Sequence, residues 1–127
     1  MNVGEIKNTV MFQTNNDAED VGEFFPYLMR YINDGYDRLV NAYAQVHPAP
    51  EHDMYRPLRH DNDIPAMPDW THKAIADWAT WLVYRNGNPQ KQQRGYVFRN
   101  AAEDIFSRVR DEGGDKGRVK NFFNIPQ

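Results

Sequence analysis

Residues 26–45, PYLMRYINDGYDRLVNAYAQ, decide the fold class of this chain. Apolar side chains recur in and around this stretch at steps of three and four residues, at Val21, Phe24, Leu28, Ile32, Tyr36, Leu39, Tyr43 and Val46. That spacing places them on one face of an α-helix, with polar side chains on the opposite face. Proline is tolerated in the first turn of a helix, so we predict a main helix from Pro26 to about Gln45. A short turn at 20–24 is predicted to precede it.

An earlier, shorter helix is predicted from Asn2 to about Phe12. Val3, Ile6 and Val10 have helical spacing, and Asn2 with Glu5 three residues later forms a capping-box pattern. The polar run at 13–17 is predicted to be a loop.

A third helix is predicted to start at Pro68 and Asp69, which are typical of a first turn and a cap. Its apolar stripe comprises Trp70, Ala74, Ile75, Trp78 and Leu82. Trp81 is turned away from this stripe, and we expect it to cap an interface. The run Asn86-Gly87-Asn88-Pro89 is predicted to end the helix.

The fourth predicted helix begins with the polar run 90–94 and is expected to end at Gly113-Gly114. Its apolar face comprises Val97, Phe98, Ala101, Ala102, Ile105, Phe106 and Val109. Five prolines within residues 47–68 predict a long loop without regular structure. The fold class is therefore all-α: a small bundle of about four helices over residues 1–112, with an extended docking tail at 113–127.

Length and composition indicate one polar globular domain. The chain has 127 residues and a formal net charge of -3, and its mean hydropathy is -0.85. No cysteine is present, which excludes disulfides, thiolate catalysis and cysteine-based metal sites. No apolar run approaches the ~18 residues of a membrane span, and the N-terminus has no secretory signal pattern. We expect a protein made in the cytoplasm with no membrane partner.

Charge is distributed unevenly along the chain. Residues 1–69 hold 12 acids and 5 bases, whereas residues 70–127 hold 6 acids and 10 bases. Such asymmetry is typical of a protein that binds a charged partner, or of one in which the basic end of one copy meets the acidic start of another. The strip Lys91, Arg94 and Arg99 is a candidate for contact with DNA or with another subunit. The overall pI of about 5.7 lacks the basic footprint of a dedicated nucleic-acid binder.

Catalytic patterns are absent from the sequence. His47, His52 and His60 lie near Glu51, Asp53, Asp61 and Asp63, but none has a His-Glu-x-x-His spacing. Ser107 is the only serine. We therefore expect no enzyme, no cofactor, no metal site and no catalytic residue. A metal-dependent hydrolase that uses the His/Asp loop remains an alternative.

The arrangement resembles the head–tail connector (adaptor, or head-completion) proteins of tailed bacteriophages, which are small helical bundles. The resemblance covers about residues 3–110. It depends on Asn16-Asp17-Ala18-Glu19-Asp20 before Leu28–Ala42, on Met67-Pro68, on Ala74–Ala79 ending in Tyr84-Arg85-Asn86, and on Phe98-Arg99-Asn100-Ala101-Ala102. The Pro-rich loop at 47–68 and the position of Pro26 depart from the family pattern.

This resemblance implies a structural virion protein at the head–tail neck, assembled in the host cytoplasm. Such proteins form a ring, typically dodecameric, beneath the portal protein, extend the DNA channel and offer a platform to a tail or stopper protein. Double-stranded DNA passes through without specific binding. In relatives the C-terminal segment reaches the portal, which makes Arg118, Lys120, Phe122, Phe123 and Ile125 the portal-docking candidates. A small DNA-binding or packaging accessory protein is the alternative.

Overall fold

The computed structural model describes residues 1–14, 24–46 and 56–116, with backbone alone for the last five. These residues form four α-helices and two 3-10 turns. The α-helices are α1 (Val3–Gln13), α3 (Leu28–Ala44), α4 (His72–Arg85) and α5 (Pro89–Lys116), and the turns are η2 (Phe25–Tyr27) and η4 (Asp69–Thr71). No strand occurs in these ranges. The predicted all-α bundle is confirmed.

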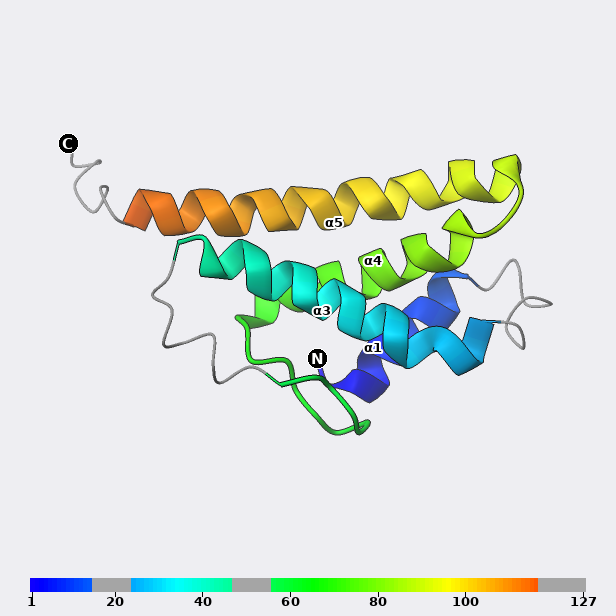
Figure 1. Ribbon diagram of the computed structural model, residues 1–127, viewed down its shortest axis with the longest axis horizontal. Coiled ribbons are helices and arrows are strands. Elements are labelled where there is room, and N and C mark those ends of the chain that lie inside the picture. The colour runs from blue at the N-terminus through cyan, green and yellow to red at the C-terminus, as the bar shows by residue number, and fades with distance from the viewer. Residues whose placement is uncertain (15–23, 47–55, 117–127) are drawn as a thin grey trace.

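Helix α4 is the central helix of the bundle. It packs against α1, α3 and α5, and 11 of its 14 residues are buried. The long helix α5 lies across α3 and α4 along one side of the molecule, and α1 lies on the opposite side (Figure 1). The core therefore sits around α4, which explains why the apolar stripe of this helix is wider than that of any other.

The beginnings of α1 and α3 follow from their local sequences. The Asn2 side chain accepts a hydrogen bond from the Glu5 backbone, and the Glu5 carboxylate accepts one from the Asn2 backbone, both at 2.8 Å. The predicted capping box is confirmed. Helix α3 begins at Leu28, two residues later than predicted, because Pro26 lies within the 3-10 turn η2, which precedes the α-helix.

The turn between α4 and α5 ends one helix and starts the next. Helix α4 ends at Arg85, and the Asn88 side chain then accepts a hydrogen bond from the Lys91 backbone at 2.9 Å. Pro89 occupies the first position of α5. Helix α5 continues through Gly113-Gly114 to Lys116, so the prediction that this glycine pair ends the helix is wrong. Glycine lowers helix stability by about 1 kcal/mol but does not block its hydrogen bonds.

The described part of the Pro-rich loop, residues 56–68, has no helix or strand, as predicted. Side chains of α3 fasten it. Asn33 bonds both the N–H and the C=O of Leu58, and the Tyr36 hydroxyl accepts a hydrogen bond from the Ala66 N–H. At the other side, the Asp63 and Asp61 carbonyls accept hydrogen bonds from the first N–H groups of α1. The loop therefore joins α1 to α3.

Trp81 is part of the core. Its side chain is only 6% exposed and its ring stacks on Tyr96 at a centroid distance of 5.2 Å. The prediction that Trp81 caps an interface is wrong, because Gly95 lets α5 approach closely enough to cover the indole.

Candidate functional site: the basic end of the bundle

The basic residues predicted to contact DNA or another subunit lie on the first half of α5. At about 100° per residue, Lys91, Arg94 and Arg99 fall within an arc of about 140° on this helix. Arg94 and Arg99 are exposed, and Lys91 is half-buried. The Arg99 guanidinium lies 5.5 Å from the centre of the Trp81 ring. The structure thus brings the three side chains to one face.

Further arginines extend this positive surface. From Trp78 to Ala102 the chain contains no Asp or Glu. Besides Lys91, Arg94 and Arg99, this stretch contains one further base, Arg85. The Tyr31 hydroxyl accepts a hydrogen bond from the Asn86 side chain at 3.1 Å, which places the start of α3 beside the α4–α5 turn. Arg30 precedes Tyr31. We call the surface formed by Arg30, Arg85, Lys91 and Arg94 the basic end.

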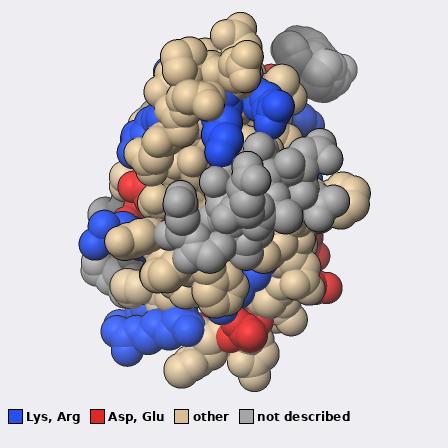
Figure 2. Space-filling model, turned by 90° about the vertical axis from the view of Figure 1, so that its right-hand side faces the viewer, with Lys and Arg blue, Asp and Glu red and all other residues tan. Residues whose placement is uncertain are grey.

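Figure 2 faces this end of the molecule, and Lys and Arg side chains gather over its upper part. Arg30 and Arg85 form no ion pair with any described residue. Guanidinium groups of this kind bind carboxylates and phosphates well, because their planar array of donors matches both. The sequence pattern predicted Lys91 and Arg94 but not Arg30 and Arg85, because only the tertiary contacts bring these two residues to the same end.

Aromatic side chains are exposed around the same end. Phe12, at the end of α1, is 82% exposed, and Phe25 and Tyr27 of η2 are about half exposed. The Tyr27 ring lies against Tyr31 at 6.4 Å. Aromatic residues and arginines are the residue types enriched where proteins bind one another. The basic end therefore has the chemistry of a protein contact as well as that of a phosphate contact.

The portal-docking candidates lie beyond the described part of the chain. These are Arg118, Lys120, Phe122, Phe123 and Ile125. Their role stays a prediction.

The histidines have different surroundings. His72 is fully buried: its Nε2 lies 2.8 Å from the Met67 carbonyl, and its Nδ1 lies 2.9 Å from the amine of Met1. His60 is exposed on the loop, whereas His47 and His52 fall outside the described ranges. Within those ranges no group of three His, Asp or Glu side chains is arranged to hold a metal ion. His72 has the surroundings of a structural residue.

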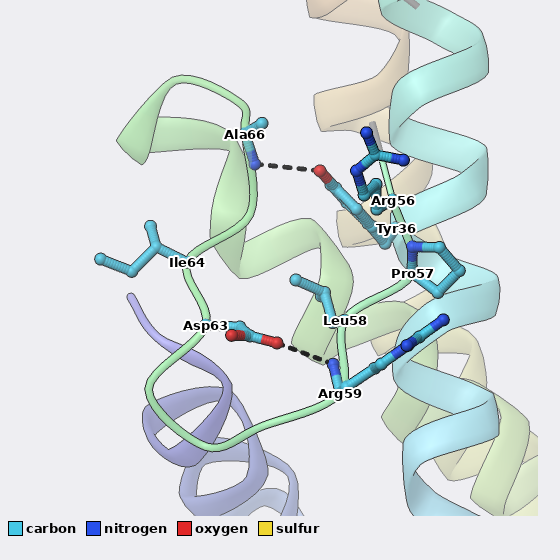
Figure 3. Close-up of a pocket in the computed structure, with 8 residues that line it drawn as sticks. All are labelled: Tyr36, Arg56, Pro57, Leu58, Arg59, Asp63, Ile64 and Ala66. Carbon is cyan, nitrogen blue, oxygen red and sulfur yellow. Dashed lines mark hydrogen bonds between the residues drawn. The ribbon is translucent and has the colours of Figure 1, made fainter. Parts of the chain in front are cut away.

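A cavity of about 550 Å³ opens between α3 and the loop (Figure 3). Its lining residues are Tyr36, Arg56, Pro57, Leu58, Arg59, Asp63, Ile64 and Ala66. Arg56 and Arg59 were not predicted from the sequence pattern. The available signal was two arginines among prolines and apolar residues, which is too common to identify a site by itself.

The fold alone is compatible with many functions, because unrelated activities occur on small helical bundles. Among the described residues no helix is both long enough and apolar enough to cross a membrane. No family model matches this chain, and no curated protein or solved structure matches it.

Proposed function

We propose that this protein is a structural virion subunit, a head–tail adaptor that forms a ring under the portal. The observation that carries the proposal is the basic end, where Arg30 and Arg85, which form no ion pair with any described residue, lie beside exposed aromatic side chains on a small, polar bundle. A contact surface at one end of a subunit suits head-to-tail assembly, in which different surfaces of neighbouring copies meet and the rotation closes a ring. The resemblance to head–tail connector proteins agrees with this role.

The proposed partners are the portal protein, a tail or stopper protein, and further copies of the chain in a ring, which we expect to be dodecameric. Double-stranded DNA would pass through the ring without specific binding. The place of action would be the head–tail neck of the virion, after assembly in the host cytoplasm. In this role the protein is not an enzyme and needs no cofactor.

A tagged pull-down from cells that produce the virion tests this proposal. We expect a portal-like protein to be recovered in stoichiometric amount and identified by mass spectrometry. Deletion of residues 117–127 should abolish this recovery, because the deletion removes the predicted docking residues. The deletion lies beyond the end of α5, so the thermal unfolding midpoint should stay unchanged. Recovery of no portal-like protein by the full chain would contradict the proposal, and unfolding of the truncated chain would show that the tail belongs to the core.

A small DNA-binding or packaging accessory protein is the second candidate function, favoured by the acid-free stretch from Trp78 to Ala102. If Lys91, Arg94 and Arg99 each neutralise one phosphate, replacing all three by glutamine should reduce the slope of log K against log salt by about 2.7. Electrophoretic shifts of random duplex DNA at several salt concentrations measure this slope. Absence of any shift at low salt would exclude this candidate.

A further inference from the structure

The cavity between α3 and the loop combines an apolar floor with two positive side chains. Leu58 and Tyr36 are buried beneath it, and Ile64 is 66% exposed at its edge. Arg56 and Arg59 flank Pro57 on the α3 side of the cavity (Figure 3). Its volume of about 550 Å³ lies within the usual range of ligand sites.

The positive charge of this cavity is not neutralised by the described residues. Arg56 and Arg59 form no ion pair with any of them. Asp63 is the one carboxylate among the lining residues, and its Oδ2 already accepts hydrogen bonds from the backbone N–H groups of His60 and Arg59. These two hydrogen bonds lower the pKa of Asp63, so the carboxylate serves to hold the turn. Neither guanidinium group is therefore paired with a carboxylate of the described residues, and both have the chemistry to bind an anion.

We propose that the cavity binds an acidic peptide segment, and that its occupant is residues 15–23 of a second copy of the chain. The segment, NNDAEDVGE, contains four carboxylates, one valine and no base. Its charge is complementary to Arg56 and Arg59, and its valine offers an apolar side chain to the floor around Leu58. This inference rests on the proposed function, since it names the partner surfaces of neighbouring subunits.

Chain length indicates that the occupant comes from another copy. Segment 15–23 is anchored at Thr14, after α1, and at Phe24, before α3, whereas the loop residues Asp61 and Asp63 contact the opposite end of α1. The 11 residues of α1 span about 16 Å. Ten steps of extended chain from Thr14 to Phe24 reach at most about 35 Å. A path from Thr14 to the cavity and back to Phe24 uses nearly all of this length. No residues of the segment are then left to lie along the cavity.

A contact of this kind would be heterologous. The segment leaves one end of the bundle, and the cavity lies beside the other end of α1, so each copy would offer one surface and accept a different one. Such contacts generate rings where the rotation closes. The proposed cavity contact would therefore explain how copies of this chain assemble in a fixed direction.

Binding of a labelled synthetic peptide with the sequence of residues 14–24 tests the inference directly. The receiving protein is the full chain with Asp17→Asn, Glu19→Gln, Asp20→Asn and Glu23→Gln, so that its own segments do not compete. We expect saturable binding by fluorescence anisotropy. Adding Arg56→Gln and Arg59→Gln should weaken it at least tenfold, because hydrogen bonds to charged groups contribute strongly. A peptide with the same four acids neutralised should bind at least tenfold more weakly.

Two double variants of the receiving protein serve as matched comparisons. Arg108→Gln with Arg110→Gln removes the same charge far along α5 and should leave the affinity unchanged. Lys91→Gln with Arg94→Gln removes two positive charges from the basic end. If this second pair abolishes binding while Arg56→Gln with Arg59→Gln does not, the peptide belongs at the basic end and the inference is wrong. Absence of peptide binding would overturn the inference without touching the portal pull-down, which tests the proposed function.

A mixing experiment tests the direction of the contact. One chain carries Arg56→Gln and Arg59→Gln with its segment intact, and the other carries the four neutralised acids with its cavity intact. Each should be monomeric alone in analytical ultracentrifugation, at a concentration tenfold above the peptide dissociation constant. Their equimolar mixture should form a 1:1 dimer that cannot grow further. A mixture that stays monomeric, or single variants that still self-associate, would overturn the inference.

Discussion

Replacing Gly95 by alanine is expected to lower the free energy of unfolding by about 1–3 kcal/mol, the usual cost of overpacking a core. A Cβ at this position would lie 2.7 Å from the Tyr84 Cβ and 2.8 Å from the Trp81 ring. Both neighbours are buried in α4 and neither is the flexible end of a side chain. Helices α4 and α5 must therefore separate locally, at a cost larger than the gain of about 1 kcal/mol in helix propensity. Chemical denaturation measures the change.

Gly4→Ala is the matched control for this substitution. Gly4 also lies inside a helix, but a Cβ there would meet its nearest neighbours at 3.4 Å or more, which is ordinary van der Waals contact. The control should leave stability unchanged or raise it by up to about 1 kcal/mol. If Gly95→Ala and Gly4→Ala have the same effect, the close approach of α4 and α5 at Gly95 is not as described.

Replacing Asp77 by alanine is expected to lower the free energy of unfolding by about 1.5–3 kcal/mol, because it removes the buried, charged acceptor of two side-chain hydrogen bonds. Asp77 is only 1% exposed, and its Oδ1 accepts hydrogen bonds from Gln13 of α1 and Lys73 of α4, both at 2.9 Å. Gln13 in turn accepts a hydrogen bond from Thr80. The ion pair itself contributes little to this figure, since the Lys73 side chain is half exposed and can return to water.

A double-mutant cycle of Asp77→Ala with Gln13→Ala separates this contact from general effects of truncation. We expect a coupling energy of about 0.5–3 kcal/mol, as found for residues in one hydrogen-bond network. Asp104→Ala is the control, because Asp104 is exposed and lies 3.9 Å from Arg108, so its loss should cost less than about 0.5 kcal/mol. A coupling near zero would show that the polar network does not join α1 to α4.

The helices could be predicted because their signals are local. The spacing of Leu28, Ile32, Tyr36 and Leu39 requires an amphipathic helix, and each of these residues is buried in the structure. The capping box at Asn2 depends on residues three apart in the chain. Helix ends were less accurate where two local tendencies compete, as at Gly113-Gly114, where the low helix propensity of glycine does not outweigh continuation of α5.

Positions that depend on packing between helices could not be predicted in the same way. Asp77 interrupts an apolar stretch of α4, and nothing in the sequence shows that Gln13 lies opposite it. Trp81 is off the main stripe of its own helix, yet it is buried because α5 covers it. The sequence pattern reports one face of each helix, whereas α4 is covered on several sides.

The sequence by itself determined that this chain is all-α, because helical periodicity and caps are properties of neighbouring residues. It also determined that the charge is uneven and that cysteine chemistry is excluded. Only the tertiary structure decided which charges lie together. Arg30 joins Arg85 at one end of the bundle through a contact between residues 31 and 86, and Arg56 and Arg59 flank a cavity because α3 and α1 fix the loop from two sides. Such groupings arise from contacts between distant segments, and these contacts follow from how the apolar faces pack together.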